Sequence, residues 1–447
     1  MLLDFLTATF AAHRDADAMV WRGRAGSYGW LLEQVRAWGR RIEAEAVRPG
    51  TVAALEADFS PNAVALLLAL VEAQAVLVPL TGAVASRKEE LLEIAEAEVA
   101  IRLAADDEAS FTRRPCTAAH PIYAELRARG HPGLVLFSSG STGKSKAAVH
   151  DLVPILDKFR APRHARRTMA FLLFDHIGGI NTMLYTLSNA GCLVTVEDRS
   201  PEAVLGAVEK HRVELLPTSP TFLNLLLVSE AYKHHDLSSL KLITYGTEPM
   251  PETTLRRLHE LLPRVELLQT YGLSEVGILR SKSKSSDSLW VKVGGEGFET
   301  RVVDGVLHVK SRSAMLGYLN APNPFTPDGW LVTGDVVQQD GEYLRILGRQ
   351  SEVINVGGQK VHPAEVENVI QEVPNVVGAV VFAEPNALTG NIVCARVALA
   401  DKEDPKQLSR RVKQHCRERL PPFAVPVKVI VVDEVEHSER FKKRRPL

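Results

Sequence analysis

Cysteine is scarce in this chain, with four residues in 447, and no two of them form a CxxC pair. Scattered single cysteines exclude a disulfide-stapled scaffold and a thiolate zinc site, and they indicate reduced core thiols in a cytoplasmic protein. A surplus of one charge is also missing, because 53 Lys and Arg residues face 54 Asp and Glu residues. This balance gives no support for a protein that binds nucleic acids or anionic membranes, which usually has a basic excess. The cysteines are Cys116, Cys192, Cys394 and Cys416.

Signals for secretion or membrane insertion are also lacking. The chain starts MLLDFLTATFAAHRDADAM, without the basic region and small-residue cleavage site of a signal peptide. The longest apolar run, residues 62–80, has about the length of a membrane span, but Glu72 and Gln74 interrupt it and Pro79 lies near its end. The run predicts a buried helix that turns into a buried strand, and we expect no membrane span.

The remaining composition is that of a folded protein. Hydrophobic residues make up 45% and charged residues 24% of the chain, close to the averages of soluble globular proteins. This excludes a disordered or collagen-like chain, and the length allows two or three domains with a large core. Strand and helix patterns alternate early on, with strands predicted at residues 51–57 and 75–79 and a helix at 61–73. Such alternation predicts parallel sheets covered by helices.

The pattern changes after about residue 281. Residues 281–288, SKSKSSDS, predict a polar loop. A hairpin follows, with strands at 300–303 and 306–310 around the turn Asp304-Gly305. The segment after residue 350 predicts a small α+β domain with helices and strands of its own, at 363–372, 376–383, 392–399, 405–419 and 427–432.

The strongest local signal is a loop rich in glycine and hydroxyl residues, in LVLFSSGSTGKSKAAVHD at residues 134–151. Successive backbone N–H groups in such a loop can bind one anion, and Ser and Thr hydroxyls add further donors. Lys144 and Lys146 supply positive charge. A Walker A loop, GxxxxGK(S/T), is an alternative, although Ser138 stands where its first glycine is required.

Five segments in a fixed order resemble the motifs of the adenylate-forming superfamily. Residues 138–146 resemble its phosphate loop, (S/T)SG(S/T)TGxPK, with Ser145 in place of proline. The other four are YGTEP at 245–249, YGLSE at 271–275, GWLVTGD at 329–335, and Gly348-Arg349 followed by GGQKVHPAEVE at 357–367. This superfamily contains acyl-CoA synthetases, adenylation domains and firefly luciferase, and the chain resembles the acyl-CoA synthetases most.

The resemblance implies an α/β fold with two domains. Residues 1–350 are expected to form a large N-terminal domain of stacked, parallel-rich sheets with helices and a small β-barrel-like subdomain. Residues 351–447 are expected to form a small, mobile α+β domain. The hinge would lie at Ser351, where the superfamily usually has Asp or Lys.

The resemblance also implies a nucleotide site. Acyl adenylation joins two anions, ATP and a carboxylate, so catalysis must neutralise charge and hold the reacting groups in line. Glu275 is implied as the Mg²⁺ ligand, Tyr271 as the ring that stacks on adenine, and Asp335 as the acceptor for the ribose hydroxyls. The implied ATP-binding residues are Ser138, Ser139, Gly140, Ser141, Thr142, Gly143, Lys146, Gly246, Thr247, Glu248, Tyr271, Gly272, Ser274, Asp335 and Arg349.

The acid would bind beside the segment LLFDHIGGIN at residues 172–181. It resembles the acyl-CoA synthetase segment in which a His and a glycine pair border the substrate, and this implies His176, Gly178 and Gly179. Phe174-Asp175 also resembles the FD pair of amino-acid-activating domains, whose Asp binds the substrate amine. The glycine pair favours the acyl alignment with a structural Asp175, and an ordinary core histidine at position 176 is a third interpretation.

Three residues of the C-terminal domain are implied in binding the thiol acceptor. Gly357 and Gly358 would let a pantetheine arm approach the backbone, and Lys360 would meet a phosphate group. A glycine turn before a helix explains the glycines equally well.

A lysine that bridges the carboxylate and the phosphate usually follows a glycine at the end of superfamily members. This chain ends HSERFKKRRPL, and an ungapped alignment puts the lysine position on Phe441. A one-residue gap puts it on Lys442, which we predict for the role, with Lys443 as the alternative. The same basic residues are also compatible with a solvated tail.

The sequence therefore predicts an ATP-dependent carboxylic acid:thiol ligase. It would form acyl-AMP and pyrophosphate with Mg²⁺, then an acyl thioester on CoA or on the phosphopantetheine of an acyl carrier protein. The alternatives are an amino-acid adenylation enzyme, a catalytically weakened homologue that binds acyl-adenylate, and a P-loop ATPase that releases ADP. The identity of the acid, the acceptor and the oligomeric state are left open.

Overall fold

Three large sheets dominate the computed structural model, which describes residues 2–139, 145–438, 441 and 443–445. The strands of the first sheet, in spatial order, are β13 (Glu266–Gln269), β12 (Leu242–Tyr245), β11 (Leu215–Thr218), β9 (Arg167–Met169), β10 (Cys192–Val194), β1 (Asp17–Trp21) and β2 (Arg24–Ser27). Those of the second are β20 (Gly317–Tyr318), β8 (Ser145–Asp151), β7 (Gly133–Ser139), β4 (Val76–Leu80), β3 (Val52–Glu56), β5 (Val99–Leu103) and β6 (Ala109–Arg113). The neighbouring central strands of both sheets run parallel, as predicted.

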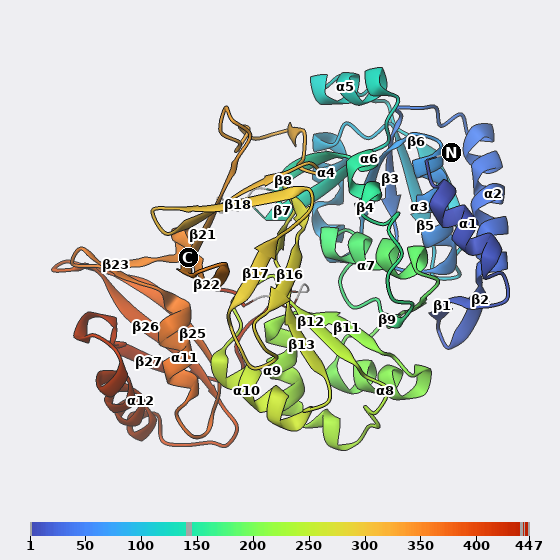
Figure 1. Cartoon of the computed structure of the whole chain (residues 1–447). Helices are drawn as coiled ribbons and strands as arrows, with labels where there is room; N and C mark the ends of the chain where they lie inside the picture. The colour runs from blue at the N-terminus through green and yellow to red at the C-terminus, as the bar shows by residue number, and fades with distance from the viewer. Residues whose placement is uncertain (1, 140–144, 439–440, 442, 446–447) are drawn as a thin grey trace.

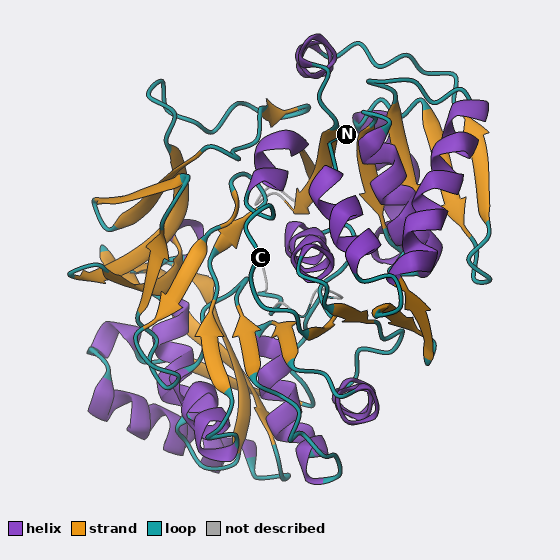
Figure 2. Ribbon diagram, turned by 45° about the vertical axis from the view of Figure 1, so that its right-hand side comes forward, coloured by secondary structure: helices purple, strands orange, loops and turns teal. Residues whose placement is uncertain are grey.

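Helices cover these parallel sheets (Figures 1 and 2). The helices are α1 (Asp4–Ala12), α2 (Tyr28–Ala44), α3 (Pro61–Glu72), α4 (Lys88–Ile94), α5 (Pro121–Arg129), α6 (Leu152–Asp157), α7 (Ile177–Ser188), α8 (Pro201–His211), α9 (Pro220–Ser229) and α10 (Glu252–Leu261). Strand β3 explains the layering, because its residues alternate between two hydrophobic clusters. Leu55 packs with the cluster of α2, α3 and α7, and Ala54 with that of α4 and α5. Both faces of the sheet are therefore buried, as expected for parallel strands.

The apolar run at residues 62–80 forms a buried helix and a buried strand, α3 and β4, as predicted. The Ser60 hydroxyl accepts a hydrogen bond from the Ala63 amide, and Pro61 occupies the first turn, so the helix begins with a side-chain cap. Among the described residues, no helix combines the length and apolar character required to cross a membrane.

The third sheet is antiparallel throughout and corresponds to the predicted barrel-like subdomain. Its strands, in spatial order, are β16 (Arg280–Ser283), β17 (Val291–Gly294), β22 (Tyr343–Arg349), β21 (Leu331–Asp340), β19 (Val306–Ser311) and β18 (Phe298–Val303). The predicted hairpin is confirmed, with positive φ at both Asp304 and Gly305. The loop predicted at residues 281–288 is wrong in its first part, because Arg280–Ser283 pairs with β17 as an edge strand.

The C-terminal residues form a separate α+β layer. Strands β25 (Val376–Asn386), β26 (Gly390–Leu399) and β27 (Lys428–Val432) make a sheet, and α11 (Pro363–Gln371) and α12 (Pro405–Arg419) pack with it around one hydrophobic cluster. Figure 1 shows this layer, in orange to red, at one side of the molecule, next to α9 and α10. The predicted elements are confirmed; the boundary at residue 350 and the mobility stay predictions.

The cysteines are all free. Cys192, Cys394 and Cys416 are buried, as predicted for core thiols. Cys116 is exposed, so the core assignment is wrong for this residue. It lies in an irregular segment between β6 and α5, where no regular element packs it into the interior.

Candidate active site

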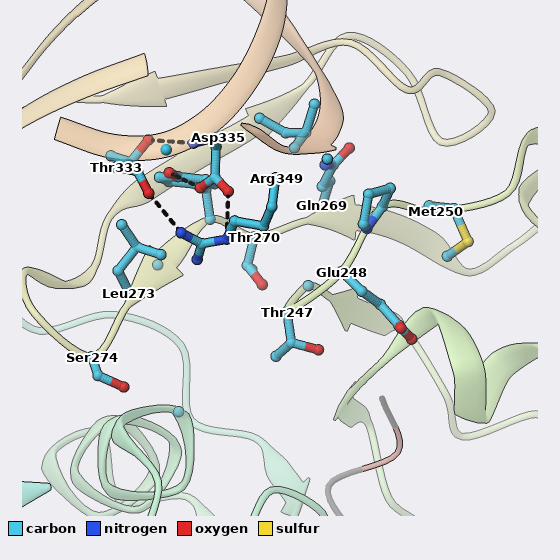
Figure 3. Close-up of a pocket in the computed structure, with 18 of the residues that line it drawn as sticks. Thr247, Glu248, Met250, Gln269, Thr270, Leu273, Ser274, Thr333, Asp335 and Arg349 are labelled. Atoms are coloured by element: carbon cyan, nitrogen blue, oxygen red, sulfur yellow. Dashed lines mark hydrogen bonds and ion pairs between the residues drawn. The ribbon is translucent and has the colours of Figure 1, made fainter. Parts of the chain in front are cut away.

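A cavity of about 640 Å³ lies where loops of the first two sheets meet β21, β22 and α11. Figure 3 shows its lining, with side chains from distant segments pointing into one space. Most residues predicted for the site lie around this cavity. Those that line it are Ser138, Lys146, His176, Gly178, Gly246, Thr247, Glu248, Tyr271, Gly272, Ser274, Glu275, Asp335, Arg349, Ser351 and Lys443.

Asp335 is at the centre of a hydrogen-bonded group on one wall (Figure 3). Its Oδ2 accepts a hydrogen bond of 2.5 Å from the Tyr271 hydroxyl, and its Oδ1 lies 2.9 Å from Arg349 Nε. Asp335 and Arg349 are cross-strand partners of β21 and β22, so the sheet register fixes the ion pair. Arg349 Nη1 also donates to the Thr333 carbonyl, at 2.6 Å. A carboxylate has about four acceptor positions, so Asp335 retains capacity for a ligand.

Burial controls the protonation of this group. Burial raises the pKa of Asp335, and the charge of Arg349 with the Tyr271 hydrogen bond offsets only part of the rise. Burial, reinforced by the Asp335 carboxylate, also raises the pKa of Tyr271 well above its usual value. The phenol therefore remains a hydrogen-bond donor at neutral pH.

A second carboxylate, Glu275, lies in the turn between β14 (Gly272–Leu273) and β15 (Gly277–Ile278). Its Oε1 accepts a hydrogen bond of 2.5 Å from the Tyr318 hydroxyl. The Lys146 ammonium lies 5.5 Å from the centre of the same ring. The Glu275 carboxylate and the Lys146 ammonium thus line one cavity wall, and both lie next to Tyr318. This pair of opposite charges suits the binding of a polyphosphate together with its cation.

His150 lies behind this wall and is fully buried against the backbone of Ser274 and Ser313. Burial lowers its pKa to about 4, and the nearby Glu275 charge raises it only in part. The unfolded chain takes up the histidine proton near pH 6.5, whereas the folded protein takes it up near pH 4.

This difference predicts a loss of stability in acid. Between pH 6.5 and pH 4 the unfolded state binds more protons than the folded state. The free energy of unfolding therefore decreases as the pH is lowered, by up to about 3 kcal/mol from this group. Urea unfolding measured between pH 7 and pH 4 checks the effect. His150→Gln should flatten the dependence, and His164→Gln at an exposed site should retain it. Equal slopes in the two variants would contradict the assignment.

The segment at 246–248 forms another wall. A Cβ atom on Gly246 would lie 2.6 Å from the Thr270 carbonyl oxygen, so only glycine fits there. Thr247 has φ +78°, a strained conformation for a β-branched residue and one that is concentrated at functional sites. Glu248 Oε1 accepts a hydrogen bond from the Thr221 amide, and its Oε2 accepts one from the Lys443 amide.

The predicted acid-binding segment starts α7. His176 caps this helix, with Nδ1 accepting a hydrogen bond of 3.0 Å from the Gly178 amide, and the neutral ring then has its proton on Nε2. Gly179 lies outside the cavity lining, and a Cβ atom there would meet the Leu173 carbonyl at 2.0 Å. Asp175 is also outside the lining, is buried and accepts a hydrogen bond from the Thr81 hydroxyl.

The basic end of the chain is folded against the protein, and the solvated-tail interpretation is wrong for two of its residues. Lys443 Nζ lies 3.1 Å from Glu367 Oε2, and Arg445 pairs with both Glu367 and Glu352. Burial alone would raise the pKa of Glu367, but the charges of Lys443 and Arg445 outweigh it and lower that pKa.

The other predicted site residues are either outside the described part of the chain or outside the cavity lining. Gly140, Ser141, Thr142, Gly143 and Lys442 are outside the described residues. Ser139 ends β7, opposite Ser145 in the hairpin with β8. The predicted thiol-acceptor residues Gly357, Gly358 and Lys360 form an exposed hairpin of β23 (Ile354–Val356) and β24 (Gln359–Val361), outside the cavity lining.

Some lining residues were not predicted. Tyr318 contacts Glu275 across 43 positions of sequence, and nothing in its local sequence signals this contact. Thr333 could have been found, because it lies inside the quoted segment GWLVTGD. Glu367 also lines the cavity and ends the quoted segment GGQKVHPAEVE.

The Walker A alternative is wrong. A P-loop leads from a strand into a helix, whose N-terminus contributes to phosphate binding. Here the glycine-rich loop joins β7 to the antiparallel strand β8. The loop therefore belongs to a hairpin.

The fold and the cavity define a two-domain α/β protein with a polar site between the large sheets and the small C-terminal layer. The chain belongs to the AMP-binding enzyme family: the family model matches residues 6–319, and the model of the AMP-binding enzyme C-terminal domain matches residues 365–442.

Known proteins resemble the chain in sequence and in fold. An indoleacetate–CoA ligase of Aromatoleum aromaticum is 29% identical over 342 residues, which cover 70% of this chain and 66% of the relative. A long-chain-fatty-acid–CoA ligase of Haemophilus influenzae is 28% identical over 332 residues, which cover 67% of this chain and 58% of that relative. The chain thus spans less than two thirds of the length of these curated relatives. The crystal structure of an anthranilate CoA ligase with anthranoyl-AMP superimposes with a TM-score of 0.84 at 19% identity, covering 99% of this chain and 95% of that one.

Proposed function

We propose that this chain is an ATP-dependent carboxylic acid:thiol ligase, which forms an acyl-adenylate and then an acyl thioester. The observation that carries the proposal is the placement of three groups around one cavity: the buried Asp335 cluster, the Glu275 carboxylate beside Lys146, and the His176 ring. Membership of the AMP-binding enzyme family and the CoA ligases among the relatives support it.

The nucleotide would lie across the wall formed by Asp335 and Arg349. The remaining acceptor positions of Asp335 suit the two ribose hydroxyls, and Arg349, which pairs with Asp335, is assigned to the ribose and phosphate side of the nucleotide. Tyr271 lines the cavity and is assigned to stack on the adenine base. The loop of Gly140, Ser141, Thr142 and Gly143, with Ser138 and Lys146 on the flanking strands, is assigned to the β- and γ-phosphates.

Glu275 is assigned to Mg²⁺. The described residues contain no group of three or more His, Cys, Asp or Glu side chains arranged for a metal. A single carboxylate facing a phosphate site fits Mg²⁺, which is usually bound by one or two carboxylates together with phosphate oxygens and water. Bound there, the ion would reduce the charge of the polyphosphate, while Tyr318 holds Glu275 in place.

The reaction would proceed in two displacements. In the first, a carboxylate oxygen bonds to the α-phosphorus of ATP, the bond to the oxygen bridging to the β-phosphorus breaks, and pyrophosphate leaves. Lys442 is assigned to bridge the two anions, because the ammonium of the alternative, Lys443, is paired with Glu367. In the second, the thiol sulfur bonds to the acyl carbon, AMP leaves with its oxygen, and the thiol proton passes to solvent.

The acid is assigned to the space beside α7. Asp175 lies outside the cavity lining and accepts a hydrogen bond from the Thr81 hydroxyl, which argues against its binding a substrate amine and so against the amino-acid adenylation alternative. His176 and Gly178 border this space. One relative is named as an indoleacetate–CoA ligase and one similar structure as an anthranilate CoA ligase. Aromatic acids are therefore the first class of substrate to test.

Thioester formation would require movement of residues 351–447 about Ser351. The exposed hairpin of Gly357 and Gly358 lies outside the cavity lining, so it reaches the site only after rotation of the C-terminal domain. CoA and a carrier-protein phosphopantetheine present the same thiol, and both remain candidate acceptors. A cytoplasmic location with access to these acceptors is part of the proposal.

Acid-dependent exchange of pyrophosphate into ATP tests this function. The screen should include indole-3-acetate, anthranilate, a fatty-acid series and amino acids, each followed by thioester analysis with CoA and with a phosphopantetheinylated carrier protein. We expect exchange with at least one carboxylic acid and release of AMP. Release of ADP, or failure of every tested acid to support exchange, would contradict the proposal. Binding of a nonhydrolysable acyl-adenylate without exchange would favour a catalytically weakened homologue.

A further inference from the structure

Phe441 is seated in an aromatic cluster on the N-terminal domain. Its ring centre lies 5.2 Å from that of Phe171 and 5.6 Å from that of Phe222, in an edge-on arrangement with the latter. His437 stacks on the same ring at 5.2 Å. Phe171 and Phe222 are almost fully buried parts of the core around the first sheet. Phe441 is therefore attached to the rigid interior of the large domain.

The backbone at Phe441 is strained. Its φ is +49°, in the left-handed region that favours glycine. The superfamily pattern described above has a glycine just before its bridging lysine, and with a one-residue gap Phe441 takes that glycine's place. A bulky residue stays in this conformation only when its surroundings hold it there. The aromatic cluster supplies those contacts.

Hydrogen bonds fix the main chain on both sides of position 442. The Ser219 hydroxyl donates to the Phe441 carbonyl at 2.8 Å, and the Lys443 amide donates to Glu248 Oε2 at 3.2 Å. Ser219 follows β11 and Glu248 follows β12, which are neighbours in the first sheet. Both attachments are thus on loops at the carboxyl ends of adjacent parallel strands, beside the cavity.

The same tail forms one wall of a second cavity, of about 420 Å³. His437, Ser438 and Phe441 face Thr81, Leu173 and other residues of the large domain there. The described tail residues therefore cover part of the surface next to the predicted acid-binding segment.

We propose that Phe441 is a positioning residue for the first half-reaction. By inserting into the cluster of Phe171, Phe222 and His437, it holds the lysine-bearing end of the chain on the large domain while the acid is adenylated. This proposal rests on the proposed function, because it assigns to Phe441 the placement of the bridging lysine. The Phe441 side chain makes no bond to the reacting groups. It has to leave the cluster of Phe171 and Phe222 when the C-terminal domain rotates.

Phe441→Gly tests the proposal, because it removes the ring and also relieves the backbone strain. The matched control is Arg444→Ala, which changes an exposed side chain of the same tail. We expect Phe441→Gly to lower kcat for acid-dependent ATP–pyrophosphate exchange at least tenfold. Thioester formation from supplied acyl-adenylate should stay within twofold of wild type, and Arg444→Ala should change neither rate by more than twofold. A structural defect would slow both half-reactions.

Hydrogen exchange separates this inference from the proposed function. In Phe441→Gly the amides of residues 434–445 should exchange faster than in Arg444→Ala, whichever activity the protein has. Unchanged amide exchange, or a kcat for pyrophosphate exchange within twofold of wild type, would overturn the inference. Faster amide exchange in a protein that activates no acid would confirm that Phe441 holds the chain end on the large domain. It would also reject the ligase assignment, and with it the positioning role of Phe441 in adenylation.

Discussion

Replacing Lys442 with alanine should lower the rate of acid-dependent ATP–pyrophosphate exchange about 100- to 1,000-fold. Adenylation brings a carboxylate against a polyphosphate, and removing one positioned donor to such a transition state typically has an effect of this size. Thioester formation from supplied acyl-adenylate should change much less, because that step has no second anion approaching the phosphate. Rapid-quench assays of the two half-reactions measure the separate effects of the substitution on adenylation and on thioester formation.

Lys443→Ala is the matched control for this prediction. Its ammonium lies 3.1 Å from Glu367 Oε2, so its loss should lower stability rather than adenylation. We expect a lower midpoint of urea unfolding and nearly normal exchange at 20–25 °C. The opposite result, with slow exchange in Lys443→Ala and normal exchange in Lys442→Ala, would transfer the bridging role to Lys443. Normal exchange in both variants and in the double variant would remove the bridging lysine from the mechanism.

Asp335→Asn should raise the KM for ATP about 100-fold. The carboxylate is the assigned acceptor for two ribose hydroxyls, and hydrogen bonds to a charged group contribute roughly 1.5 kcal/mol each. The amide would also place a donor NH₂ where either Tyr271 or Arg349 now donates. Initial-rate kinetics at varied ATP and calorimetric titration with a nonhydrolysable ATP analogue both measure the change.

Tyr271→Phe is the control for Asp335→Asn. This substitution keeps the aromatic ring at a position that lines the cavity and removes only the 2.5 Å hydrogen bond to Asp335. We expect a rise in KM below tenfold, since Arg349 still pairs with the carboxylate. An unchanged KM for ATP in Asp335→Asn, with the circular dichroism spectrum intact, would place the ribose elsewhere.

Most of the motif residues line one cavity, because each motif is a short segment next to a strand end or a strand pairing of the sheets. Asp335 lies opposite Arg349 through the register of two consecutive strands, so the quoted segments already contained both residues of the ion pair. Family resemblance gave the roles, and the cavity brings the residues together.

What escaped prediction depends on contacts between distant segments. Tyr318 reaches Glu275 from 43 residues away, and Arg445 reaches Glu367 from 78 residues away. The polar pattern at residues 281–283 predicts a loop, but polar and charged residues are also typical of exposed edge strands, where only one side is paired. Single-sequence patterns contain no information about such partners.

The hydrogen bond between Glu248 and the Lys443 amide has a thermodynamic consequence. Glu248 lines the cavity, holds the Thr221 amide with one oxygen and holds the tail with the other. Under the proposed rotation of the C-terminal domain, binding of nucleotide in the cavity and attachment of the tail are two equilibria that involve the same side chain, Glu248. If closure raises the affinity for nucleotide by some factor, nucleotide must favour closure by the same factor. The affinity for nucleotide and the position of the tail are therefore linked within one chain, and the chain end acts as an internal second ligand.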